Sequence, residues 1–315
     1  MTEVMENGIT ASVSMEEKEK NRVASSSLIA AVFLTSFKLV VGISTNSLGI
    51  LSEAAHSGLD LLAALVTYIA IRISSKPADE EHHFGHGKME NISALFETVL
   101  LLITCFWIIS EVIKRLTGGH MEVEVNVWSF VVIITSMAID ISRSRALKKI
   151  AKKYNSQALE ADALHFSSDI FSSGVVLIGL AGYAFGFHYA DSIAALIVAV
   201  IVIFISINLG KRSIDVLLDK APEGIKERVS KIISEIPEVL QWHDIKVRNS
   251  GAHVLIELKI HVAPDLSINK AHEISHKVEE SICSEIERCE VNIHIEPEET
   301  LHVKRWKRKN WNHRK

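Results

Sequence analysis

A pattern of three ionisable residues occurs twice in this chain, each time inside a long apolar run. Both copies read acid, two residues, His, three residues, Asp, and their members are Glu53, His56 and Asp60, and then Asp162, His165 and Asp169. Residues three or four apart lie on one face of a helix, so each copy directs its imidazole and carboxylates the same way. Because ionisable groups are costly at membrane depth and rarely face lipid, we expect the two helices to face each other. The repeat therefore predicts a helical membrane bundle in which two imidazoles and two carboxylates meet at one small ion.

Two other interpretations of the pattern are open. A His and an Asp four residues apart are ordinary on a soluble helix. The same spacing marks some acyltransferases, in which the His is a general base. Such an enzyme needs one pair beside an acyl-donor pocket, whereas this chain has two equivalent pairs in apolar surroundings. The repetition favours a metal site and a protein that is not an enzyme.

The composition indicates a membrane part joined to a soluble part. Of the 315 residues, 48% are hydrophobic and 23% are charged, and the net charge is -4. The mean hydropathy of +0.23 is too high for an ordinary soluble domain. Cys105, Cys283 and Cys289 show no Cys-x-x-Cys spacing, so we expect reduced thiols. The first twenty residues lack an apolar core, so no cleaved signal peptide is expected and the chain should start in the cytoplasm.

Six apolar runs are long enough to be transmembrane helices. They cover residues 24–43, 48–73, 92–113, 125–141, a run that starts near 158, and 193–209. Lys and Arg gather before the first run, between the second and third, in the loop expected at 143–154, and after the sixth. By the positive-inside rule, both termini are cytoplasmic. The membrane is a cell inner membrane or an organelle membrane.

The last third of the chain has the pattern of a small α+β domain. A helix is expected over 222–236, strands over 243–247 and 253–262, a helix over 268–286 and a strand over 289–295. The expected fold class is thus an α-helical polytopic membrane protein with six transmembrane helices and a C-terminal cytoplasmic α-β-β-α-β domain, similar to a metallochaperone. The expected divisions are a flexible N-terminus (1–22), a membrane domain (23–212), the soluble domain (213–298) and a basic tail (299–315). The tail either solubilises the protein or binds anionic headgroups through its basic residues, with Trp306 and Trp311 beside them.

These features, together with the loop Phe84-Gly-His86-Gly-Lys88-x-Glu90, resemble the cation diffusion facilitator family of metal exporters. The resemblance covers residues 24–297 in order. It implies that His56, Asp60, His165 and Asp169 form the transport site. Two imidazoles and two carboxylates also suit tetrahedral Zn²⁺, whereas Mg²⁺ and Ca²⁺ prefer oxygen ligands. Cobalt, iron, nickel, manganese and cadmium stay open, as does a non-transporting member that binds metal and acts as a partner or regulator.

The resemblance further implies a Zn²⁺/H⁺ antiporter that works by alternating access, with divalent metal and protons as substrates. No phosphate-binding glycine loop is present, so ATP drive is not expected. Glu53 and Asp162 are expected beside the ligands or on a proton path. The soluble domain is expected to form a homodimer in which Trp242 makes contact, and no nucleic-acid partner is expected.

The resemblance implies two further metal sites outside the membrane. Their residues are Asp79, His82 and His86 in the loop, and His243, His272, His294 and Glu296 in the soluble domain. A surface His cluster is the alternative in the loop. The family's strand His, thirteen residues before His272, is Lys259 here. His261 lies two residues further on the same strand face and can substitute for it.

Overall fold

The computed structural model describes residues 2–45, 48–118, 127–184, 190–251 and 253–298. The basic tail expected at 299–315, with Trp306 and Trp311, lies outside them. The chain divides into two compact units, Met1–Leu217 and Leu218–Lys315. The division falls slightly after the boundary expected at 212/213, because the last helix of the first unit continues to Leu217.

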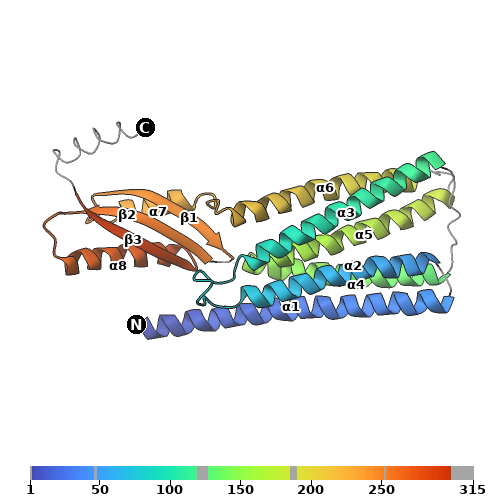
Figure 1. Ribbon diagram of the computed structural model, residues 1–315, viewed down its shortest axis with the longest axis horizontal. Helices are drawn as coiled ribbons and strands as arrows, with labels where there is room; N and C mark the ends of the chain where they lie inside the picture. The colour runs from blue at the N-terminus through green and yellow to red at the C-terminus, as the bar shows by residue number, and fades with distance from the viewer. Residues whose placement is uncertain (1, 46–47, 119–126, 185–189, 252, 299–315) are drawn as a thin grey trace. The chain divides into compact units, whose positions relative to one another are not determined.

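The first unit contains six long helices that run side by side (Figure 1). They are α1 Thr2–Thr45, α2 Leu48–Ser74, α3 Met89–Gly118, α4 Val127–Tyr154, α5 Gln157–Ala184 and α6 Ala190–Leu217. Helix α5 contacts α2, α3, α4 and α6, and helix α2 contacts α1, α3, α4 and α5. All six lie where the apolar runs predicted helices, so this part of the fold prediction is confirmed.

Four helical segments among the described residues are long and apolar enough to cross a membrane. They are Met15–Ser44, Ala54–Ser74, Met89–Lys114 and Ala195–Leu217. Of the remaining two helices, α4 is less apolar because its last twelve residues include six Lys and Arg, and α5 carries the second ionisable motif. Large apolar side chains such as Phe33, Phe106 and Phe204 are exposed on the outside of the unit, as lipid-facing side chains are.

Two segments expected outside the helices are helical. The first helix begins at Thr2, where a flexible segment 1–22 was expected. Its residue Lys20 is buried and its Nζ lies 2.8 Å from Glu90 Oε1 on α3. The expected loop 143–154 is the last part of α4, which ends where Asn155 adopts a left-handed conformation.

The second unit is a three-stranded sheet with two helices on one face. Its elements are α7 Ile225–Ser234, β1 Gln241–Ser250, β2 His253–Val262, α8 Ile268–Glu285 and β3 Cys289–Pro297. The strand order is β1-β2-β3, with β1 antiparallel and β3 parallel to β2. Alternate residues of β2, from Ile256 to Val262, pack with apolar residues of both helices into one core. The predicted α-β-β-α-β order is confirmed, and the other face of the sheet is left for polar side chains.

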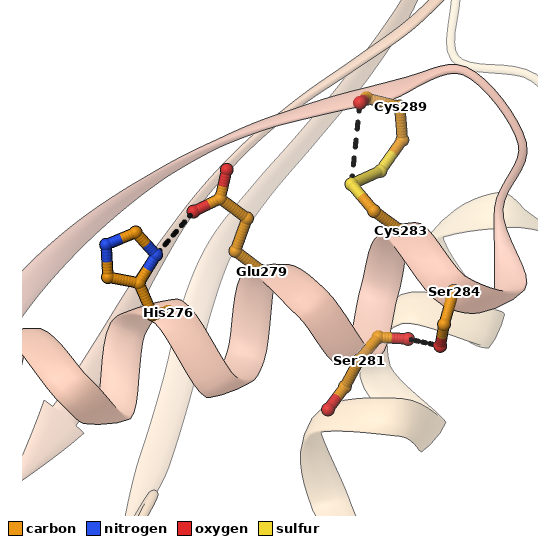
Figure 2. The surroundings of a disulfide bond; sticks show 6 residues. All are labelled: His276, Glu279, Ser281, Cys283, Ser284 and Cys289. Carbon is orange, nitrogen blue, oxygen red and sulfur yellow. Dashed lines mark hydrogen bonds and ion pairs between the residues drawn. A yellow bond between two sulfur atoms is a disulfide. The ribbon is translucent and has the colours of Figure 1, made fainter. Parts of the chain in front are cut away.

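Cys283 near the end of α8 and Cys289 at the start of β3 form a disulfide (Figure 2). The expectation of reduced thiols is wrong for this pair. The chain reverses between α8 and β3, which brings the two Cα atoms within 5.5 Å, a separation that a disulfide spans. Cys105 on α3 is a buried free thiol.

Candidate metal centre

The two copies of the ionisable motif lie on α2 and α5, and four of their side chains converge. His165 Nε2 is 3.0 Å from Asp60 Oδ1 and 4.0 Å from Asp169 Oδ2. His56 Nε2 is 3.6 Å from Asp169 Oδ1 and 3.8 Å from Asp60 Oδ1. Each imidazole therefore faces a carboxylate of its own helix and one of the other helix. We call these four residues the transmembrane centre.

The transmembrane centre is shielded from solvent to different degrees. The side chain of His165 is 3% exposed and that of His56 is 21% exposed. Ligand atoms of His56, Asp60 and Asp169 all lie within 4.8 Å of one another, a spacing that suits one metal ion. The arrangement can offer two nitrogen and two oxygen ligands to a cation.

Asp162, one turn before His165, points into a different buried network. Ser27 Oγ on α1 donates to Asp162 Oδ2 at 3.1 Å, and Arg143 on α4 donates to the same hydroxyl at 3.1 Å. Asp162 thus lies beside α1 and α4, outside the group of four. The side chain of Glu53 lies outside the described part of the chain.

Two residues that we did not predict lie behind His165. Glu97 Oε2 on α3 is 3.7 Å from His165 Nδ1. Thr67 on α2 donates to the other oxygen of Glu97 at 2.8 Å. The available signal was a carboxylate in the middle of the third apolar run, where ionisable residues are rare.

A second group of possible ligands lies in the loop between α2 and α3. Asp79 Oδ1 is 3.2 Å from His82 Nδ1, and Asp79 Oδ2 is 3.4 Å from His86 Nε2. The backbone N–H groups of His82 and Glu81 donate to the Asp79 carboxylate at 2.6 Å and 3.0 Å, and these bonds lower its pKa. An ionised Asp79 thus faces two imidazoles, and we call these three residues the loop group.

A third group lies on the open face of the sheet in the second unit. His243 Nε2 and His261 Nε2 are 3.0 Å apart, and Glu296 Oε2 is 3.6 Å from the first and 3.5 Å from the second. We call these three residues the sheet group. A bulge after His243 and the register that pairs His261 with both Gln241 and Glu296 bring them together.

Lys259 occupies the position at which the resemblance led us to expect a His. Its Nζ is 3.1 Å from Asp244 Oδ2 and 3.8 Å from Glu296 Oε1. The hydrogen bond from this ammonium lowers the pKa of Asp244. His261 is the imidazole that faces His243.

The other predicted residues of the soluble unit are not members of the sheet group. His294 is on the same sheet face, with Nε2 3.6 Å from Glu296 Oε1. His272 is on the exposed side of α8 with its ring against His276, because α8 packs on the opposite face of the sheet. Trp242, expected at a dimer contact, packs against the core and donates its indole N–H to Ser230 at 2.9 Å.

Two family models match almost all of the described chain. The model of the cation efflux transmembrane domain matches residues 24–218, and that of the cytoplasmic domain of cation efflux proteins matches residues 221–298. The chain belongs to the cation efflux family. The resemblance to cation diffusion facilitators is thereby confirmed.

Relatives of this cation efflux protein match over nearly their full length. An uncharacterized transporter of Methanocaldococcus jannaschii is 32% identical over 89% of this chain and 99% of its own. The cation-efflux pump FieF of Shewanella oneidensis is 32% identical over 86% of this chain and 92% of its own. The metal-bound C-terminal domain of the CzcD transporter from Thermotoga maritima is 26% identical over 24% of this chain and 91% of its own, with a TM-score of 0.24.

Family membership makes this cation efflux protein an integral membrane transporter of divalent metal ions. The transmembrane centre lies within the matched transmembrane domain, and the sheet group lies within the matched cytoplasmic domain.

Proposed function

We propose that this protein is a Zn²⁺/H⁺ antiporter that exports Zn²⁺ from the cytoplasm through the transmembrane centre. The observation that carries the proposal is that donor atoms of His56, Asp60 and Asp169 lie within 4.8 Å of one another, with His165 Nε2 3.0 Å from Asp60 Oδ1. Two neutral imidazoles and two carboxylates balance the charge of one divalent ion.

The donor set favours zinc over the other divalent ions. Zn²⁺ takes four ligands from His nitrogen and carboxylate oxygen in tetrahedral sites. Mg²⁺ and Ca²⁺ prefer oxygen ligands, so a site with two imidazoles disfavours the binding of these ions. Iron, cobalt and nickel also bind imidazole, so the experiment below includes competing metals.

Proton coupling follows from the chemistry of the ligands. A His must be neutral and a carboxylate must be ionised to bind metal, so metal binding releases protons. Imidazole changes its charge near neutral pH, so protons and Zn²⁺ compete for the same centre. Loading from the cytoplasm then releases protons, and protons that enter from the far side expel the metal.

The soluble unit is proposed to bind cytoplasmic metal at the sheet group and to hold two copies of the chain together as a homodimer. The donor atoms of His243, His261 and Glu296 support the first part. Replacing His261 with alanine should lower the number of Zn²⁺ ions bound per chain, measured by equilibrium dialysis, while the transmembrane centre still transports. An unchanged number of bound Zn²⁺ ions would mean that His261 is not a ligand.

The loop group is proposed as a further cytoplasmic metal site on the side of the membrane where both termini lie. Asp79, with its lowered pKa, stays ionised across the physiological range and so can bind a cation at any pH at which His82 and His86 are neutral.

The test of the transport proposal is zinc and proton flux in proteoliposomes with a zinc indicator and a pH indicator inside. Inward Zn²⁺ movement should alkalinise the lumen of vesicles that start with an acidic interior, because protons leave as the metal enters. Asp169→Asn should abolish both signals, while Glu160→Gln, at a half-buried carboxylate on the same helix that pairs with Arg212 instead of the centre, should leave both intact. Flux of Zn²⁺ that persists in Asp169→Asn, or that moves no protons, would contradict the proposal.

A further inference from the structure

One buried carboxylate lies next to the transmembrane centre without being part of it. Glu97 is in the middle of α3 and its side chain is 0% exposed. Its Oε2 faces His165 Nδ1 at 3.7 Å. Neither atom has a hydrogen-bond partner among the described residues. Buried polar atoms nearly always have hydrogen-bond partners, because a buried atom without one costs free energy. The arrangement of Glu97 Oε2 and His165 Nδ1 therefore requires an explanation.

The other side of Glu97 is firmly held. Thr67 Oγ1 donates to Glu97 Oε1 at 2.8 Å, and Thr67 is itself fully buried. Thr67 is on α2, two turns after Asp60. The helix that carries two residues of the transmembrane centre therefore also fixes the direction in which Glu97 presents its free oxygen.

The two ring nitrogens of His165 face different partners. Nε2 faces the transmembrane centre, 3.0 Å from Asp60 Oδ1, and Nδ1 faces Glu97. A His that binds metal through one nitrogen almost always donates its other ring N–H to a carboxylate, a carbonyl or water. That second hydrogen bond determines which nitrogen carries the proton.

We propose that Glu97 is the positioning residue of His165: it accepts a hydrogen bond from Nδ1–H while Nε2 binds the transported cation. The inference rests on the proposed transport centre. Nε2 cannot donate a proton to Asp60 and give its lone pair to a cation at the same time. When the cation takes Nε2, the proton of the neutral ring is on Nδ1, and Glu97 is the acceptor that faces it. A small closing movement turns the 3.7 Å separation into a hydrogen bond.

The experiment measures zinc flux in proteoliposomes as a function of Zn²⁺ concentration for four variants. Glu97→Leu removes the acceptor at similar size, and Glu97→Gln keeps an oxygen acceptor but loses the charge. Thr98→Val is the matched control, because Thr98 is a buried neighbour on α3 whose hydroxyl donates to the backbone oxygen of Ala94 on its own helix. Asp60→Asn reports on the transport centre itself.

Glu97→Leu should raise the Zn²⁺ concentration for half-maximal flux by about 10- to 100-fold, the usual cost of losing the partner of a ligating His. Glu97→Gln should raise this concentration less, and Thr98→Val should not change it. In Glu97→Leu, the maximal flux should fall by a smaller factor than the factor by which the concentration for half-maximal flux rises. If Glu97→Leu does not reconstitute, the comparison of Glu97→Gln with Thr98→Val decides. The inference is overturned if the Glu97 variants keep the half-saturation of the unmodified protein, or if Thr98→Val changes it as much as they do.

The two proposals fail in distinguishable ways. If Asp60→Asn is inactive and Glu97→Leu transports Zn²⁺ like the unmodified protein, only the role of Glu97 is overturned. An Asp60→Asn that transports Zn²⁺ normally would overturn the transport centre and, with it, the role of Glu97 as the positioning residue of a ligand.

Discussion

Replacing His56 with aspartate should change which metals the transmembrane centre accepts. The change leaves one nitrogen and three carboxylate ligands, and a more oxygen-rich site favours harder or larger ions. We expect Cd²⁺ flux to rise relative to Zn²⁺ flux in proteoliposomes that contain His56→Asp. An unaltered ratio of the two fluxes would mean that His56 does not contact the ion during transport.

The residues of the transmembrane centre could be predicted because the motif that contains them occurs twice in the sequence. His56 and Asp60 repeat as His165 and Asp169 at the same spacing, and residues four apart lie on one face of a helix. Glu97 belongs to no repeat, and only the packing of α3 against α5 brings it to His165.

Outside the membrane, sequence alone was a weaker guide to the ligands. His261 was expected to take the place of the His that is Lys259 here, and it does lie against His243. His272 was expected nearby, but it lies on the exposed side of a helix that covers the other face of the sheet. A strand's side-chain alternation is visible in a sequence, whereas the face of the sheet on which a helix packs is not.

At the scale of elements, α3 and α6 approach closely at a glycine. A Cβ atom added to Gly210 would lie 2.8 Å from Thr98 Cγ2, which is too close unless the Thr98 side chain or one of the two helices shifts. Gly210→Ala should therefore destabilise the protein by about 1–3 kcal/mol, as overpacking does.

The thermal midpoint of the purified protein in detergent measures this effect. Adding Thr98→Ser removes the methyl group that would clash, and should recover most of the lost stability. A Gly210→Ala variant as stable as the unmodified protein would mean that the two helices are not packed this closely.

Buried charges hold α1 against α3 at Lys20. Lys20 Nζ lies 2.9 Å from Glu16 Oε1 and 2.8 Å from Glu90 Oε1, and Ser156, just before α5, also donates to Glu90. Removing one partner of a buried ion pair leaves the other uncompensated, so Lys20→Met should cost about 3–5 kcal/mol.

Lys18→Met, an exposed position on the same turn, is the control and should change the midpoint little. Glu90→Gln added to Lys20→Met should restore part of the loss. If the two single lysine variants unfold at the same temperature, the buried network does not hold α1 against α3.

The ends of elements were predicted less well than their existence. Residues 143–154 were expected to form a loop because of their six basic residues, yet they continue α4. Lys and Arg are good helix formers, so a basic run indicates the side of the membrane and does not indicate where the helix ends. The start of α1 at Thr2 was missed because the first twenty residues lack an apolar run, and the disulfide was missed because Cys283 and Cys289 are six residues apart and do not have a Cys-x-x-Cys spacing.

At the scale of the whole molecule, the sequence predicts the side of the membrane on which the two termini lie. The charge pattern of the loops predicts that both termini are in the cytoplasm. Epitope tags at the two ends should both be cleaved by protease added to inside-out membrane vesicles, and neither should be cleaved in right-side-out vesicles. Tags cleaved on opposite sides would mean an odd number of transmembrane helices.

The overall organisation was the most predictable level. Hydropathy, the positions of turn residues and the alternation of 253–262 together predicted six membrane helices followed by a small α+β unit. Among the described residues, four of the six helices contain a segment long and apolar enough to cross a membrane, and one of these four is α2, which carries His56 and Asp60.

The most direct test is a structure of the full-length protein determined with Zn²⁺ present in lipid nanodiscs. We predict one ion bound by His56, Asp60, His165 and Asp169, at distances of about 2.0–2.2 Å from each ligand atom. Zinc found only at the loop group and the sheet group, with those four side chains bound to no ion, would contradict the account.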